Sequence, residues 1–150
     1  MKYEKLLTVI LFLLALSLIV FLTFQNSGKS GELSNGITDR ILHFLWESGL
    51  MKYDFIRNSD FGYVLVRKIG HIAEYFLLGM TAMLLFRKFP KALLKAVLLC
   101  AAISLLDQSV KSFLPGREFD PTDFPYDFAG YASGAFIASF FGKKRNNDRK

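Results

Sequence analysis

Long apolar segments separated by short polar ones dominate the chain. Residues 6–24 contain no charged side chain, and about 20 consecutive apolar residues are enough to cross a bilayer as a helix. Segments of similar length and mostly apolar character cover about residues 64–86, 92–110 and 124–141. The pattern predicts an all-α, polytopic membrane protein in which four transmembrane helices form one bundle, with residues 1–150 as a single domain.

The first apolar segment has a second interpretation, a cleaved signal peptide, because Lys2 and Lys5 precede it. A secretory signal has a shorter apolar region and ends in a small-x-small cleavage site. Phe24, Gln25 and Asn26 do not form such a site. We therefore expect this segment to be retained as the first helix.

The orientation of the helices follows from the positions of Lys and Arg, because basic residues near helix ends favour the cytoplasmic side. These residues gather at positions 2–5, in the turn at 87–95 and in the tail at 142–150. With four spans, all three places lie on the same side of the membrane. We expect both termini in the cytoplasm and the loops 25–63 and 111–123 outside.

The first outer loop contains apolar residues at helical spacing: Ile37, Ile41, Leu42 and Leu45. This spacing predicts a short amphipathic helix. Trp46, Tyr53 and Phe55 follow it, and aromatic residues favour the membrane interface. We expect an extracellular amphipathic segment at the membrane surface, with His43 at the interface rather than in a catalytic site.

Composition narrows the function classes. The formal net charge is +6, but the basic residues stand beside apolar segments, so lipid headgroups account for them better than nucleic acid does. A single cysteine, Cys100, excludes an intramolecular disulfide and a cysteine-based zinc site. We expect no cofactor, and the oligomeric state stays open.

Ionisable residues inside the predicted spans are the candidate site. Arg67, His71 and Glu74 share one face of the second helix by their i, i+4, i+7 spacing. Asp107 and Lys111 form an i, i+4 pair on the third helix, and Asp123 and Asp127 do so at the start of the fourth. The helical rise of about 1.5 Å per residue brings all of them to one shallow layer near the outer face. An unpaired charge in a membrane costs at least about 2.5 kcal/mol, so these groups should face one another.

Two interpretations of this layer remain open. In the first, it is a satisfied structural network in which Arg117 covers Asp123 or Asp127, Lys111 pairs with Asp107, and His71 bonds Glu74. In the second, it is a polar pocket open to the outer leaflet, where His71 exchanges protons near neutral pH and a carboxylate orients it. A divalent cation is a weaker alternative, because the spacing of these residues matches no strong metal signature.

The functional interpretation divides the residues by role. The catalytic candidates are His71, Glu74, Asp107 and Asp127. The ligand-binding candidates are Arg67, Lys68, Arg117 and Asp123. On the fourth helix, a stripe of small residues predicts close helix packing: Gly130, Gly134, Ala138 and Gly142.

The same residues resemble the VanZ-like family of membrane proteins, which is associated with low-level resistance to the glycopeptide antibiotic teicoplanin. The matching features cover about residues 6–141: Arg67-Lys68-x-x-His71-x-x-Glu74-Tyr75 with Gly79, Asp107, Phe113-x-Pro115-Gly116-Arg117, and then Asp123, Asp127 and Gly130. The Pro-Gly-Arg block with its spaced aspartates is the most specific part. Where the family commonly has Asp-Glu followed by Gln, this chain has Asp107-Gln108 and Lys111, which makes the third helix less acidic. If the family's activity needs the second carboxylate, this member is altered or inactive; alternatively, an Asp107–Lys111 pair keeps the fold and changes the ligand preference.

The resemblance implies a cell-envelope role at the outer face of a bacterial cytoplasmic membrane, where the outward pocket would lower susceptibility to lipophilic glycopeptides. The expected partners are membrane lipids and a lipophilic glycopeptide or a cell-wall precursor. One alternative is an outer-leaflet enzyme that modifies a lipid or cell-wall precursor, with His71 as general base. Another is a small partner subunit of a transporter.

Overall fold

The computed structural model describes residues 2–24, 61–115 and 119–147, together with isolated positions between 36 and 49. Within these residues the ordered elements are helical: α1 (Lys2–Thr23), α4 (Phe61–Phe86), α5 (Ala92–Lys111), the short 3-10 helix η1 (Pro121–Asp123) and α6 (Phe124–Asn147). The predicted all-helical class is confirmed for this part of the chain.

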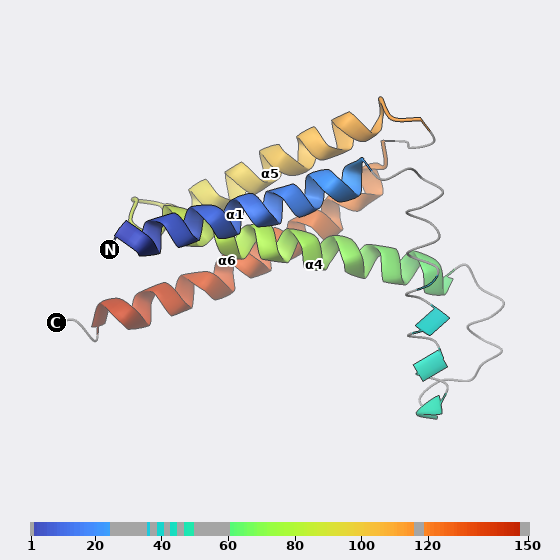
Figure 1. Cartoon of the computed structure of the whole chain (residues 1–150), viewed down its shortest axis with the longest axis horizontal. Coiled ribbons are helices and arrows are strands. Elements are labelled where there is room, and N and C mark those ends of the chain that lie inside the picture. The colour runs from blue at the N-terminus through green and yellow to red at the C-terminus, as the bar shows by residue number, and fades with distance from the viewer. Residues whose placement is uncertain are drawn as a thin grey trace.

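The four long helices run alongside one another, and α4 contacts each of the other three (Figure 1). The start of α1, the α4–α5 turn and the end of α6 lie at one end of the bundle (Figure 1). The end of α1, the start of α4 and the connection from α5 to α6 lie at the other, which we call the distal end. Successive long helices therefore alternate in direction.

Local chemistry explains where the helices end. After α4, Lys91 takes up a left-handed conformation with φ 54°, and α5 begins at the next residue. At the distal end, Asp120 accepts a hydrogen bond from the backbone N–H of Thr122, and Pro121 occupies the first turn of η1, the position in a helix that best tolerates proline. α6 then continues directly from η1.

Two helices are longer than the apolar pattern indicated. α1 begins at Lys2 rather than near residue 6, because the charged residues before the apolar segment are also good helix formers. α6 continues to Asn147 instead of ending at 141, so much of the predicted tail 142–150 is helical. Lys and Arg in this stretch favour a helix C-terminus, where they oppose the partial negative charge.

Within the described residues, three helical segments are long and apolar enough to cross a membrane: Tyr3–Thr23, Arg67–Phe86 and Ala92–Lys111. Large apolar side chains remain exposed along them, among them Leu14, Leu98 and Leu106. Such a surface is unfavourable in water and suits lipid, so the chain is a membrane protein. α6 has 24 residues but a more polar composition, and its membrane crossing stays a prediction, as does the orientation of the bundle.

The predicted amphipathic segment is only partly covered. Its apolar residues Ile37, Ile41, Leu42 and Leu45 lie outside the described residues, and so do Trp46, Tyr53 and Phe55. Among the described positions nearby, the backbone N–H of Ser48 donates to the carbonyl of Phe44 at 2.9 Å, a helical turn.

Glycines allow α4 and α6 to approach closely. A Cβ atom on Gly79 would overlap the backbone of Tyr131, one on Gly130 would meet the carbonyl of Ile72, and one on Gly134 would overlap the carbonyl of Phe76. Ala138 is also buried. The close packing predicted for the small-residue stripe is thus confirmed for Gly130 and Gly134, with Gly79 as its counterpart on α4, and the surroundings of Gly142 lie outside what the structure describes.

Substituting Gly134 with Val should destabilise the protein by about 1–3 kcal/mol, because the added side chain has to displace the backbone of α4. Thermal unfolding of purified protein in detergent measures the effect. Gly70→Ala is the matched control, since the nearest atom to its new Cβ is Glu74 Oε1 at 4.0 Å. An equal loss for both variants would contradict a specific contact between the helices.

Candidate functional site

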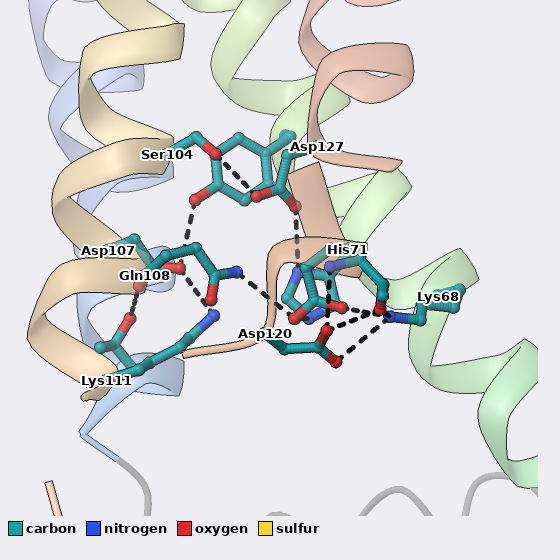
Figure 2. Close-up of polar contacts among 12 residues, drawn as sticks. Lys68, His71, Ser104, Asp107, Gln108, Lys111, Asp120 and Asp127 are labelled. Atoms are coloured by element: carbon teal, nitrogen blue, oxygen red, sulfur yellow. Dashed lines mark hydrogen bonds and ion pairs between the residues drawn. The ribbon is translucent and has the colours of Figure 1, made fainter. Parts of the chain in front are cut away.

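A single polar network occupies the distal end of the bundle, and all four long helices and η1 contribute to it (Figure 2). We use the name polar network for these residues: Thr23, Lys68, His71, Tyr75, Ser104, Asp107, Gln108, Lys111, Asp120, Thr122, Asp123 and Asp127. Most of the ionisable residues that were predicted to form one layer therefore lie together in the structure and contact one another.

His71 lies between two buried carboxylates (Figure 2). Its Nδ1 is 3.1 Å from Asp127 Oδ1 and its Nε2 is 3.4 Å from Asp123 Oδ2. Only an imidazolium can donate from both ring nitrogens, so this geometry fits a charged histidine between two carboxylates. The second oxygen of Asp127 accepts a hydrogen bond from Ser104 at 2.7 Å.

Lys68 is the counter-ion of the start of α6. Its ammonium pairs with Asp123, donates to the hydroxyl of Thr122 at 2.9 Å and lies 3.7 Å from Asp120 Oδ2. It also sits 5.1 Å from the centre of the Tyr126 ring, within cation–π range. The ammonium that was expected to bind a ligand thus already has partners within the chain.

Asp107 joins α1, α4 and α5. It pairs with Lys111 at 2.7 Å and accepts a hydrogen bond from the Tyr75 hydroxyl at 3.2 Å and another from the Thr23 hydroxyl. Both members of the Asp107–Lys111 pair are buried, and the pair is the one that the i, i+4 spacing predicts.

Gln108 is fully buried beside this pair. Its Nε2 donates to Asp123 Oδ2 at 3.3 Å, while its Oε1 has no hydrogen-bond partner. Thr23, Tyr75, Ser104 and Gln108 were not among the candidate residues. Their positions in the sequence could have indicated them. Tyr75 lies one helical turn after His71, and Ser104 and Gln108 lie beside Asp107 on the buried face of α5.

The remaining candidates lie apart from these contacts. Glu74 is half-buried, and His71 bonds Asp127 instead, so the expected His71–Glu74 bond is wrong. The reason is that the imidazole turns toward α6, where two carboxylates meet it. Arg67 is exposed, and Arg117 lies outside the described residues.

Among the described residues, no group of three His, Cys, Asp or Glu side chains has an arrangement suited to a metal ion.

Charges within the buried part of the network balance. Lys68, Lys111 and an imidazolium at His71 face three carboxylates, those of Asp107, Asp123 and Asp127. Such a balance is what allows ionised groups to be buried, since removing one partner leaves an uncompensated charge. Within this balance, Asp127 orients the imidazole of His71 through the contact at Nδ1.

At the rim of the network, local hydrogen bonds stabilise the ionised form of Asp120. The side chain and the backbone N–H of Thr122 donate to its Oδ1 at 2.6 and 2.9 Å. The Thr122 hydroxyl bond, its backbone bond and the charge of Lys68 lower the pKa of Asp120 below its ordinary value of 3.8. Asp120 therefore stays ionised as it caps η1.

Comparison with known proteins finds one matching protein family. A model of the VanZ/LLP1 family matches residues 8–142 of the chain. No curated protein and no solved structure matches it.

Replacing Lys111 with Met should destabilise the protein by about 3–5 kcal/mol, because it leaves the Asp107 carboxylate buried without its cation. The double variant Lys111→Met/Asp107→Asn should recover much of this loss, since no charge is left unpaired. Thermal unfolding in detergent compares them, with the exposed Lys88→Met as control. Equal stability of single and double variants would argue against the ion pair.

The Asp120 cap should make stability depend on pH at the acid end. A carboxyl group whose pKa is lowered by folding stabilises the folded state above its unfolded pKa, and this contribution disappears as pH falls through the folded value. Unfolding temperatures of wild type and Asp120→Asn should therefore differ at pH 7, and the difference should begin to shrink as pH falls to about 3.8 and vanish below the lowered pKa of the folded state. A difference that is constant across the pH range would contradict this role.

Proposed function

The chain belongs to the VanZ/LLP1 family, and from this we propose that it acts at the outer face of the bacterial cytoplasmic membrane to lower susceptibility to teicoplanin-type lipophilic glycopeptides. The polar network at the distal end of the bundle is the site through which it acts. Its partner there is the glycopeptide itself or the cell-wall precursor that the glycopeptide binds.

The observation that carries this proposal is the burial of opposed charges at one end of the bundle. Asp123 and Asp127 are fully buried, and Asp107 and Lys111 nearly so. Apolar packing of similar volume would join the helices without the cost of removing these charges from water, and the small residues of α4 and α6 already provide close packing. Ionisable residues inside a membrane are by default a sign of function.

The distribution of basic residues supports the outward orientation. Arg87 and Lys88 lie at the end of the bundle opposite the polar network, where α1 also begins and α6 ends (Figure 1). Basic residues near helix ends favour the cytoplasmic side. This orientation directs the network toward the compartment where glycopeptides meet their target.

A second candidate function is an enzyme of the outer leaflet, favoured by the contact between Asp127 and His71 Nδ1. A histidine that acts as a general base is oriented by a third group, here Asp127, and Ser104 in turn fixes Asp127. The second nitrogen of His71 faces Asp123 at 3.4 Å, so a substrate would have to take the place of that carboxylate, and the imidazolium would have to lose its Nε2 proton before that nitrogen could act as a base. Conversion of a lipid substrate by purified protein distinguishes this function from binding alone.

Expression of the wild type in a susceptible bacterium should reduce its sensitivity to teicoplanin, and His71→Ala should abolish this protection. The substitution removes the cation between Asp123 and Asp127 and so disrupts the site. The minimal inhibitory concentration is the measurement, with membrane levels of each variant determined in parallel.

His43→Ala is the matched control, because the other histidine of the chain lies outside the polar network and should be dispensable. Equal protection by wild type and His71→Ala at equal membrane levels would refute the role of the network. Absence of protection by the wild type would refute the antibiotic function itself.

A further inference from the structure

One acceptor in the polar network lacks a donor. Gln108 is fully buried, and its Oε1 has no hydrogen-bond partner. Rotating the amide by half a turn would not solve this, because the oxygen would then face the Asp123 carboxylate that now accepts from Nε2. A buried acceptor left unpaired is costly, so this position calls for a donor, and no described residue has one within hydrogen-bond distance of it.

A carboxylate that the network does not use lies in the same region. Glu74 is half-buried, and in the described part of the chain it makes no hydrogen bond or ion pair. It is close enough to His71 and Lys111 to be attracted by both, and to Asp107 and Asp127 to be repelled by them. Its oxygens are therefore available as acceptors beside the Asp107–Lys111 pair.

Lys111 supplies donors to the same region. An ammonium carries three N–H groups, and the contact with Asp107 at 2.7 Å uses one of them. Gln108 and Lys111 lie three positions apart on the buried face of α5, so their side chains are neighbours (Figure 2). The region thus combines unused acceptors with unused donors.

We propose that Gln108, Lys111 and Glu74 form a subsite for a hydroxyl group of a sugar or polyol carried by an amphiphile. A hydroxyl both donates and accepts, so it can donate to Gln108 Oε1 or to Glu74 while it accepts from Lys111. A phosphate cannot donate when ionised and is repelled by Glu74, and an ammonium cannot accept and is repelled by Lys111. This inference rests on the proposed function and names the chemistry that its site recognises.

The position of the subsite suits a headgroup. Lys111 is the last residue of α5, and Gln108 lies three residues earlier, about 4.5 Å along the helix axis. A sugar at the distal end of the bundle would therefore reach these side chains while its apolar chain stayed along the exposed leucines of α5, such as Leu106.

The test measures binding to purified full-length protein in phosphatidylcholine nanodiscs. One arm titrates a glucosyl-diacylglycerol into the nanodiscs, a second adds teicoplanin, and a third titrates phosphatidylethanolamine as an ammonium headgroup without a sugar. Native mass spectrometry counts the bound molecules. We expect binding in the first or second arm, which identifies the source of the sugar, and none in the third.

The variants Glu74→Gln and Gln108→Met should each weaken that binding about fivefold, the effect of losing one hydrogen bond. Leu106→Met, a change on the exposed side of the same helix, should leave it unchanged. Glu74→Gln should keep the unfolding temperature of the wild type, because Glu74 has no hydrogen bond or ion pair to lose in the part of the chain described, so its weaker binding cannot be ascribed to misfolding.

Absence of sugar binding in both arms, or equal affinity of wild type and the two variants, would overturn the subsite. Protection of cells together with absent sugar binding would refute this inference and not the proposed function. Sugar binding that both variants weaken, together with cells that the wild type does not protect, would support the subsite and refute the proposed function.

Discussion

The close approach of α4 and α6 is the constraint on which the rest of the structure depends. Gly79, Gly130 and Gly134 bring backbone atoms of the two helices into direct contact. This contact holds the first turns of α6 near the first half of α4, so that His71 reaches Asp123 and Asp127 together. A larger side chain at the glycines would separate the charges as well as the helices.

Burial and charge pairing in the polar network support each other. Each buried carboxylate has at least one cation, and hydroxyl or amide donors occupy further oxygens. In the low dielectric of the bundle, pairing is strong and an unpaired group is costly. The network therefore behaves as one unit, in which the loss of one member changes the surroundings of the others. Gln108 Oε1 and the Glu74 carboxylate differ from the other acceptors of this region, because neither has a hydrogen-bond donor among the described residues.

The sequence predicted the helices well, and it predicted that most of the ionisable residues gather at one end of the bundle, because apolar length and helical rise determine both. It predicted the Asp107–Lys111 pair, whose spacing is local. The partner of His71 was mistaken, since that choice depends on how α4 and α6 are rotated against each other, which spacing within one helix does not contain. Thr23 and Tyr75 were missed for the same reason, because their partner Asp107 is distant in sequence.

The composition of α6 has a consequence for how the protein is made. α1 is apolar enough to enter a bilayer without help, whereas α6 carries Asp127, three glycines and a basic C-terminal part. A carboxylate that crosses the translocon without a counter-ion is expensive, and the counter-ions of Asp123 in η1 and Asp127 in α6 stand on α4. To cross the membrane as predicted, α6 is therefore expected to dock on helices already in the membrane, late in assembly and with the help of His71 and Lys68.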